Sequence, residues 1–344
     1  MKSPRTRARL RALALIAGVA ALSLGFVLLG PPRKWQSSQL PRNFRIGMAV
    51  GENSLASAFA SQSAQLGVSS WSAAVTGDSS WSGGTPFTTT VNNSLGNVGF
   101  VNDGLSTISW EDPQNMLATG VLAATTTGYY ATSPTEVVNG TAFGKITDSD
   151  LVGNNGVNFT SFAEADAQGA NGNQYDMDSI LVHEVGHAHG LAHSTGEPTT
   201  MYPSIGANDW RKRTLDDDDV NGVRFIYVNG YHSQSSPAGT QLISNPVFLG
   251  LSPATFKGNS STYIGVQVVD QYGHQVSAAN VTVSVTTPTG SVLTGTAATN
   301  SIGQVTFNAG KAAHGNWSTT VTNITKAGMS FNAGAGKSSE SCTS

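Results

Sequence analysis

The chain has 344 residues, enough for two domains of ordinary size, and only 11% of them are charged. Its net charge of −3 conceals an asymmetry, because residues 1–45 hold nine Lys/Arg and no acid, whereas residues 46–344 hold nine against all 21 acids, a net of −12. An acidic body without a basic patch argues against nucleic acid as a partner, and a single cysteine, Cys342, excludes an intramolecular disulfide and a cysteine-based metal site.

The first 30 residues have the pattern of an export signal. Basic residues up to Arg11 precede an almost wholly apolar run over 12–30, which is broken only by Ser23. This run is long for a signal peptide and just long enough to cross a bilayer. Residues 1–30 are therefore predicted to be a signal peptide, cleaved near 19–21, or a signal anchor that holds the protein in the membrane through 12–30. In both cases the body is expected on the non-cytoplasmic side, secreted or anchored, because the positive flank stays inside.

Residues 31–50 are expected to be a linker or a short pro-segment, and residues 51–228 a first folded domain. Leu55, Phe59 and Leu66 have helical spacing and predict a helix over 51–66. Short apolar runs between turn residues then predict strands near 98–101, 106–110, 117–130 and 142–146, with the apolar stretch 116–127 left ambiguous.

From Asp176 the apolar spacing becomes helical again. Asp176 is the expected N-cap of this helix, and Gly190 is the expected residue just beyond its end. A second helix is predicted through Tyr227, with the acids Asp216–Asp219 in its first turn, where the helix dipole favours negative charge.

The C-terminal third has a different pattern. Residues 229–246 are rich in Ser, Pro and Gly and are predicted to be a linker. Residues 247–334 alternate between apolar and polar side chains, with turn residues at regular intervals, which predicts an all-β, Ig-like sandwich. Residues 335–344 are expected to be a flexible tail, which would make Cys342 a free thiol.

Four of the seven histidines lie within HEVGHAHGLAH, residues 183–193. His183 and His187 are one helical turn apart, so their imidazoles project from the same face and can share one tetrahedral zinc ion. Gly190 can adopt a positive φ and turn the chain so that His193 becomes a third ligand. Three neutral ligands leave one coordination position for water, which is typical of a catalytic rather than a structural zinc site.

Two further residues of this stretch take different roles. Glu184 lies about 100° around the helix from His183 and can face the open coordination position, where it would act as general base. His189 lies about 200° from His187 and cannot be a ligand together with the others, so a surface or packing role is expected.

These residues resemble a known family. HEVGHAHGLAHS is similar to the HExxHxxGxxH(S) signature of metzincin zinc peptidases, and more narrowly to their matrixin branch of bacterial type. Met201, in the sequence TMYP, resembles the Met-turn that supports the metal site in this family. Residues 215–223 resemble the family's C-terminal helix, with Asp218 and Asp219 on its paired acids. The resemblance covers about residues 50–228, and residues 247–334 resemble Ig-like or fibronectin-III-like modules of secreted bacterial enzymes.

The resemblance implies an α+β zincin-like catalytic domain, with a mixed twisted sheet and an active-site helix, followed by the all-β sandwich. It implies a zinc-dependent metalloendopeptidase that acts on proteins and peptides. One zinc ion would be held by His183, His187 and His193, with Glu184 as the general base and Met201 as support.

The chain departs from the family pattern at three points. It has no upstream cysteine for a cysteine switch and no upstream histidines for a second zinc site, and Pro203 stands where some metzincins place a tyrosine near the metal. Structural calcium is an open expectation at Asp148, Asp150, Asn154 or the 168–174 loop, where ordinary turn chemistry explains the residues equally well.

Two alternatives remain open. In the first, the protein is a non-catalytic exported adhesin that uses the Ig-like module, although a purely structural zinc site has no need of Glu184. In the second, it is a gluzincin-type peptidase with a distant glutamate as third ligand, against which Gly190 and His193 argue. The C-terminal module is expected to bind a surface or a carbohydrate or protein ligand, and the protein is expected to be a monomer.

Overall fold

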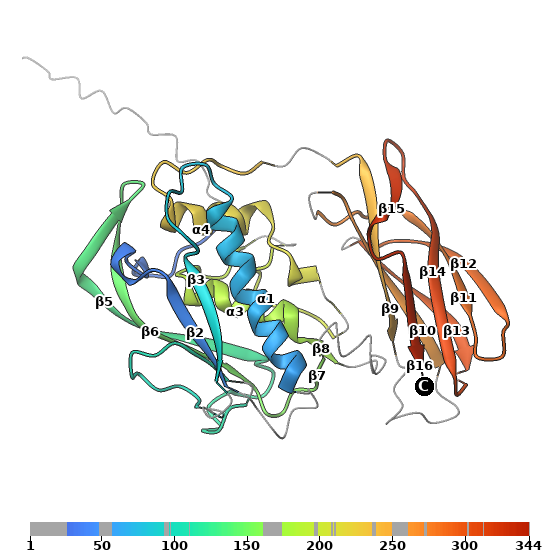
Figure 1. The fold of residues 1–344 in the computed structure, drawn as a ribbon, viewed down its shortest axis with the longest axis horizontal. Helices are drawn as coiled ribbons and strands as arrows, with labels where there is room; N and C mark the ends of the chain where they lie inside the picture. The colour runs from blue at the N-terminus through green and yellow to red at the C-terminus, as the bar shows by residue number, and fades with distance from the viewer. Residues whose placement is uncertain are drawn as a thin grey trace, which may run out of the picture.

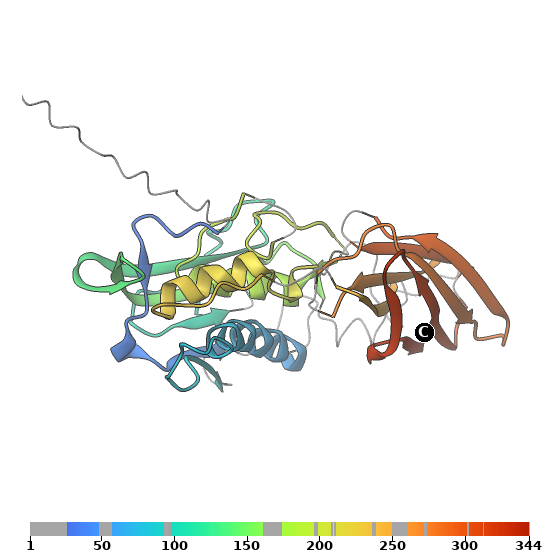
Figure 2. The same ribbon diagram turned by 90° about the horizontal axis from the view of Figure 1, so that it is seen from above.

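The chain forms an N-terminal α+β lobe and a C-terminal all-β lobe that lie side by side in both views (Figure 1, Figure 2). Each lobe has its own hydrophobic core. No helix within the described part of the chain is long and apolar enough to cross a membrane. The computed structural model describes residues 26–47, 57–92, 96, 98–109, 111–160, 174–195, 199–207, 209, 211–235, 239–249, 261–271, 274–300, 303–311 and 313–343.

A mixed six-stranded sheet forms one layer of the N-terminal lobe. Neighbours along the order β1-β6-β4-β2-β3 are parallel, and β5 pairs antiparallel with β6. Among the described strands β5 has no second neighbour, so it is an edge strand that runs past the end of the sheet (Figure 1). The strands are β1 (Arg33–Lys34), β2 (Arg42–Gly47), β3 (Phe87–Asn92), β4 (Thr107–Ser109), β5 (Ala123–Val138) and β6 (Thr141–Gly153).

The helices of this lobe are α1 (Ser57–Thr76), α3 (Met177–Ala188) and α4 (Asp217–Tyr227), with short 3-10 turns η1 (Ser37–Gln39) and η2 (Arg211–Arg213). A short parallel pair, β7 (Phe159–Thr160) and β8 (Tyr175–Asp176), leads into α3. Helix α1 continues beyond the predicted end at 66, because Val68, Trp71 and Val75 extend its buried face. The Trp71 indole N–H donates a 2.7 Å hydrogen bond to the Val182 carbonyl oxygen, which fixes α1 against α3.

The prediction of a linker or pro-segment over 31–50 needs correction, because the described residues of this segment include β1 and β2 of the sheet. Phe44 and Ile46 are buried, and the basic residues that gave the segment a polar character have partners in the fold. Lys34 is buried and forms a 2.6 Å ion pair with Glu136, and the Arg42 guanidinium lies 4.1 Å from the centre of a Trp35 ring. Pairing and stacking let cations enter a folded layer, so charge alone does not mark a linker here.

The end of the apolar run 12–30 also belongs to the folded lobe. Leu29 N–H donates to the Gly190 carbonyl oxygen at 2.9 Å, and Ala192 N–H donates to the Val27 carbonyl oxygen at 2.8 Å. The ring of Phe26 packs against Phe225 of α4, with centroids 5.4 Å apart. The last residues of the predicted run therefore contact the lobe, and the part of the predicted signal before residue 26 lies outside the described residues.

The strand predictions of the N-terminal lobe were right in part. The predicted runs 106–110, 117–130 and 142–146 correspond to β4, β5 and β6, whereas 98–101 forms no strand. Instead, the backbone N–H of Val101 donates to the Asp150 carboxylate at 2.8 Å. A side chain thus takes the place of a neighbouring strand at this position.

The C-terminal lobe consists of two four-stranded sheets, ordered β13-β10-β9-β15 and β12-β11-β14-β16. Valines 281, 283 and 285 alternate inward and share one core with residues of the other sheet, including Ile264 and Val266, as a sandwich requires. The strands are β9 (Gln241–Leu249), β10 (Ser261–Val269), β11 (Asn280–Thr286), β12 (Val292–Ala298), β13 (Gln304–Lys311), β14 (Asn316–Thr325), β15 (Ser330–Gly336) and β16 (Ser339–Thr343).

Two boundaries of this lobe differ from the prediction. Strand β9 begins inside the expected linker 229–246, and the expected tail 335–344 contains β16, in which Cys342 pairs with Trp317 of β14. Both segments are rich in small polar residues, so they lack the apolar alternation from which strands are predicted. Backbone pairing with a neighbouring strand orders them instead.

The first part of the predicted linker is attached to the N-terminal lobe. His232 N–H donates to the Asp78 carboxylate at 2.7 Å. Asn221 of α4 and Gln234 exchange two hydrogen bonds, of 2.8 and 2.6 Å. The chain therefore follows α4 as far as Gln234 before it crosses to the C-terminal lobe.

Candidate metal and catalytic site

The ends of α3 are set by the residues that the sequence indicated. The Asp176 carboxylate caps the helix by accepting the Ser179 N–H at 2.9 Å. Gly190 has φ of +106°, and a Cβ atom at this position would clash with the Arg33 carbonyl oxygen. The predicted turn after the helix is therefore confirmed, and only glycine satisfies both its conformation and its space.

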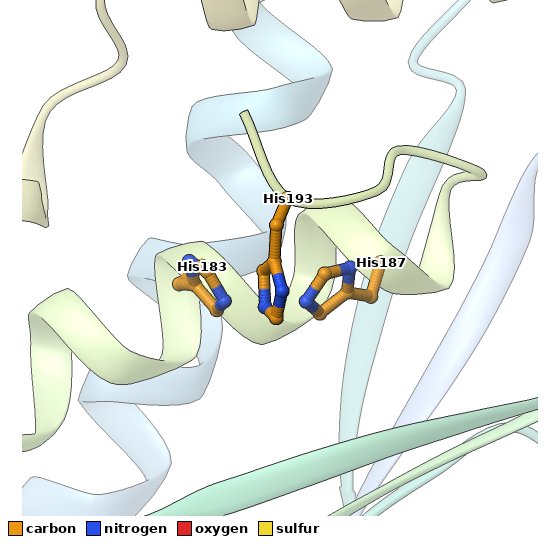
Figure 3. Close-up of side chains that lie close together, drawn as sticks. All are labelled: His183, His187 and His193. Carbon is orange, nitrogen blue, oxygen red and sulfur yellow. The ribbon is translucent and has the colours of Figure 1, made fainter. Parts of the chain in front are cut away.

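Three histidines converge at this turn. His183 and His187 project from α3, and His193 returns toward them from the following loop, so that the three rings face one another (Figure 3). Their ring centroids lie 4.7–5.2 Å apart, and their ligand nitrogens lie within 4.8 Å of one another. Within the part of the chain that the structure describes, this is the one group of three or more potential ligands. Three imidazoles suit a divalent zinc ion.

The hydrogen bonds of two ligands fix which ring nitrogen is available. His183 Nδ1 lies 2.6 Å from the Thr200 carbonyl oxygen, and His187 Nδ1 lies 2.8 Å from the Leu191 carbonyl oxygen. A carbonyl oxygen can only accept, so both Nδ1 atoms carry the proton and both Nε2 atoms have a lone pair for a metal.

Electrostatics keeps the ligands neutral. Burial, followed by the neighbouring His187 ring, lowers the pKa of His183 well below its usual value. Burial also lowers the pKa of His187 and of His193. Neutral imidazoles at pH 7 are the form that binds metal.

The turn around Met201 packs against helix α3 at the histidine cluster. Met201 is buried, and its sulfur packs so closely on Gly186, between the two helical ligands, that a Cβ atom at 186 would clash with it. Ser194 N–H donates to the Met201 carbonyl oxygen at 2.9 Å, which ties the residue after His193 to this turn. The turn around Met201 therefore contacts both helix α3 and the segment that carries His193.

Asp219 holds this turn in place. Its carboxylate accepts hydrogen bonds from the backbone N–H groups of Thr200, at 2.8 Å, and Met201, at 3.1 Å. It also accepts the Asp216 N–H at 2.9 Å and completes the capping box of α4. The sequence indicated the acidic first turn, but the link to the Met-turn is visible only in the fold.

Glu184 lies beside the histidines and is buried. Thr125 of the edge strand β5 donates its hydroxyl to the Glu184 carboxylate at 2.8 Å, and the same hydroxyl is 3.0 Å from the Glu184 carbonyl oxygen. Burial raises the pKa of Glu184 to about 7, while the Thr125 hydrogen bond and the charge of Lys212 act in the opposite direction. Thr125 was missed in the sequence because nothing in its surroundings marks it.

A cavity of about 330 Å³ opens next to Glu184 and His193. Its walls come from residues 120–123, where β5 begins, from Ile180 of α3, and from residues 203–205 after the Met-turn. The cavity therefore opens directly beside the histidine cluster.

His189 has the packing role that was one of its two predicted roles. Its ring is fully buried and stacks on Phe87, with centroids 3.7 Å apart. Burial lowers its pKa to about 3. Neither ring nitrogen has a hydrogen-bond partner among the described residues.

The residues considered for calcium are engaged with the backbone. Asp148 accepts the N–H groups of Asp103 and Gly104 at 2.9 and 3.1 Å, and Asp150 accepts the Thr107 hydroxyl at 2.6 Å. The Asn154 amide donates to two carbonyl oxygens. These contacts account for all three side chains, and residues 168–173 of the other candidate loop lie outside the described residues.

Three converging imidazoles beside a buried carboxylate and a cavity define the class of catalytic zinc sites. The sequence profile described as Matrixin matches residues 53–228, which is more than half of the chain, and the chain belongs to this family. This membership and the histidine cluster indicate a zinc metallopeptidase.

Curated relatives match over a shorter stretch. The chain is 40% identical over 67 residues to Metalloendoproteinase 2-MMP of Arabidopsis thaliana, which covers 19% of this chain and 18% of that protein. It is 45% identical over 53 residues to Metalloendoproteinase 1 of Glycine max, 15% of this chain and 17% of the relative. It is 39% identical over 57 residues to Matrix metalloproteinase-27 of Homo sapiens, a match that covers 17% of this chain and 11% of that relative. The chain thus spans less than a fifth of the length of each relative.

Proposed function

We propose that the protein is an exported zinc-dependent endopeptidase that hydrolyses peptide bonds in proteins. The observation that carries this proposal is the convergence of His183, His187 and His193 beside the buried Glu184, at the mouth of a cavity. A purely structural zinc site would not need a carboxylate buried at that point, because burial of a charged group is costly.

In this proposal His183 and His187 would hold one zinc ion through their Nε2 atoms, and His193 would hold it through a ring nitrogen. When bound, zinc supplies Lewis acidity, which acidifies a water molecule and polarises the scissile carbonyl. Glu184 takes the proton from the attacking water and delivers it to the leaving amine. Thr125 orients the Glu184 carboxylate through its 2.8 Å hydrogen bond.

The substrate would bind in an extended conformation along β5. This strand lacks a second neighbour among the described strands, and its Thr125 contacts the general base. An extended peptide can therefore add to the strand edge through backbone hydrogen bonds while one side chain enters the cavity. Export is supported by the basic and apolar pattern of residues 1–30.

The sandwich of the C-terminal lobe is proposed to be an Ig-like module that binds a surface, a carbohydrate or a protein, and the protein is proposed to be a monomer. These statements rest on fold analogy. They do not enter the catalytic argument.

The test is digestion of unfolded casein by the full-length chain, with and without o-phenanthroline. Glu184→Ala should keep one zinc ion per chain and lose cleavage, because it removes the base but no ligand. His193→Ala should lose both zinc and cleavage, whereas His314→Ala, at an exposed histidine of the C-terminal lobe, should lose neither. Cleavage by Glu184→Ala would refute the assigned base. A zinc-loaded wild-type chain that cleaves no unfolded protein would favour the adhesin alternative.

A further inference from the structure

A guanidinium group lies beside the edge strand β5. Arg33 Nη1 donates to the Thr127 hydroxyl of this strand at 3.2 Å, and the guanidinium carbon lies 3.7 Å from the centre of the Tyr129 ring. Its Nε and Nη2 atoms donate to the carbonyl oxygens of Pro31 and Gly30, at 3.3 and 3.0 Å. These contacts hold the side chain of Arg33 along β5 in one orientation.

Two contacts place Arg33 relative to the histidine cluster. Side chains two residues apart on a strand share one face, so Thr127 lies on the same face of β5 as Thr125, about 7 Å further along. The Thr125 hydroxyl donates to the Glu184 carboxylate. The Arg33 carbonyl oxygen lies against Gly190, just beyond the last residue of α3. Arg33 is therefore at the end of the site where α3 ends, one strand repeat beyond the contact with the general base.

The cavity lies toward the other end of α3. Its walls include residues 120–123, where β5 begins, and Ile180 in the first turn of the helix. A peptide that extends along β5 with one side chain in the cavity would continue past Thr125 to Thr127, where it comes within reach of Arg33. At about 3.4 Å per residue, the peptide residue opposite Thr127 is about four residues from the residue in the cavity.

Arg33 differs in its partners from two other buried cations of this lobe. Lys34 pairs with Glu136 at 2.6 Å, and Arg224 lies 3.8 Å from the Asp78 carboxylate. Among the described residues Arg33 has no carboxylate partner, and its hydrogen bonds use three of its five N–H groups, one on each nitrogen. One N–H on each terminal nitrogen therefore remains for an acceptor from outside the chain.

We propose that Arg33 recognises an acidic side chain of the substrate, about three or four residues from the scissile bond on the side away from the cavity. This inference rests on the proposed peptidase function and specifies its substrate class. The planar guanidinium can donate two hydrogen bonds to one carboxylate. Because Gly30 and Pro31 beside it are exposed, the attraction should weaken as the salt concentration rises, whereas a preference for shape alone should not.

The test uses quenched fluorescent peptides of one sequence that place Glu, Gln or Leu at each of four positions on either side of the cleaved bond, which mass spectrometry identifies. The Leu peptides mark the position held in the cavity, whose walls include Val121, Leu122 and Ile205. On the other side of the bond, at the third or fourth position, kcat/KM for Glu should exceed that for Gln by about fivefold or more at low salt. The difference should lie in KM rather than kcat and should shrink at high salt.

Variants of the arginine separate its charge from its shape. Arg33→Met should reduce the ratio of Glu to Gln to about one. Arg33→Lys keeps the charge but not the planar pair of donors, so it should retain part of the ratio. Arg42→Met is the matched control, because Arg42 also donates to a carbonyl oxygen and stacks on an aromatic ring but belongs to β2 in the interior of the sheet. It should keep the wild-type ratio.

Binding gives a second readout that does not depend on turnover. Fluorescence anisotropy with the zinc-loaded Glu184→Ala chain should show the same preference for the Glu peptide in Kd, and Arg33→Met in that background should abolish it. Equal values for Glu and Gln at every position in the wild-type chain, or an unchanged ratio in Arg33→Met, would overturn the role of Arg33. If Arg33→Met does not fold in a thermal unfolding assay, Arg33→Gln, which keeps hydrogen-bond donors without the charge, tests the same ratio.

The two proposals fail in different ways. Casein cleavage without discrimination between Glu and Gln would remove only the recognition by Arg33. If no substrate is cleaved, the peptidase proposal fails, and the Kd ratio still decides whether Arg33 binds acidic side chains.

Discussion

The substitution His189→Leu should stabilise the protein. A neutral imidazole has one N–H donor and one acceptor, and neither has a partner at His189 among the described residues. Each buried group left without a partner costs about 1–3 kcal/mol. Leucine removes both groups at similar volume but gives up the stacking on Phe87, which is worth about 0.5–1.5 kcal/mol. The expected net gain in the free energy of unfolding at pH 7 is between about 0.5 and 5 kcal/mol.

The gain should grow as the pH falls. The pKa of His189 is lowered to about 3 in the folded chain, whereas the unfolded value is about 6.5. A depressed folded pKa means that the unfolded chain binds the proton first, so stability is complete above about pH 6.5 and is lost as the pH falls toward 3. At pH 5 the wild-type chain should have lost about 2 kcal/mol through this histidine alone, a loss that His189→Leu avoids.

The assay is urea unfolding at pH 7 and pH 5 in the Glu184→Ala background, which prevents self-digestion. Far-ultraviolet circular dichroism follows α1, α3 and α4, which all lie in the N-terminal lobe. His314→Leu controls for the general effect of replacing a histidine. Two results together would show that the His189 ring has a hydrogen-bond partner in solution. His189→Leu would be less stable than the wild-type chain, and the difference in the free energy of unfolding would be the same at pH 7 and pH 5.

Three further predictions concern the site and the contact between the lobes. Gly190→Ala should lower the free energy of unfolding by at least about 3 kcal/mol and weaken zinc binding, because the turn needs a positive φ and has no room for a Cβ atom. Urea unfolding and zinc analysis test this, and wild-type stability together with wild-type zinc content would contradict it. Asp219→Asn should cost about 1–3 kcal/mol, because the amide presents a donor to backbone N–H groups, and calorimetry together with zinc competition measures the effect on the Met-turn. Partial burial lowers the pKa of His274, but the hydrogen bond to Asp270 and the charges of Asp270 and Asp217 raise it above the usual value. Asp217→Asn should therefore lower that pKa in an NMR titration, and an unchanged value would mean that the 3.6 Å contact of Asp217 with His274 is absent in solution.

The elements that the sequence predicted well are those specified locally. Helix α3 has its apolar face, its cap at Asp176 and its terminating Gly190 within one short stretch, and the same stretch contains all three histidines of the cluster. The spacing of residues in the sequence is enough to predict such a unit, because the same helical repeat sets the apolar face and places His183 and His187 one turn apart.

The missed parts depend on residues far apart in the chain. Strands β1 and β16 contain few apolar residues, and they are ordered by partners in β6 and β14 that no local pattern reveals. Thr125 reaches Glu184 across 59 residues of sequence, and Lys212 enters the cavity only because η2 packs near α3. Such contacts arise from tertiary packing, which overrides local propensity at strand edges.

The path of the chain after α4 has a consequence for how the two lobes act together. In the connection between the lobes, Gln234 is still hydrogen-bonded to Asn221 of the N-terminal lobe, whereas Gly239 N–H donates to Asp270 of the C-terminal lobe at 3.1 Å. Even fully extended, the connection between these points spans at most about 18 Å. A tether this short gives anything held by the C-terminal lobe a high local concentration at the histidine cluster. Lengthening it would dilute such a target without altering a single contact in either lobe.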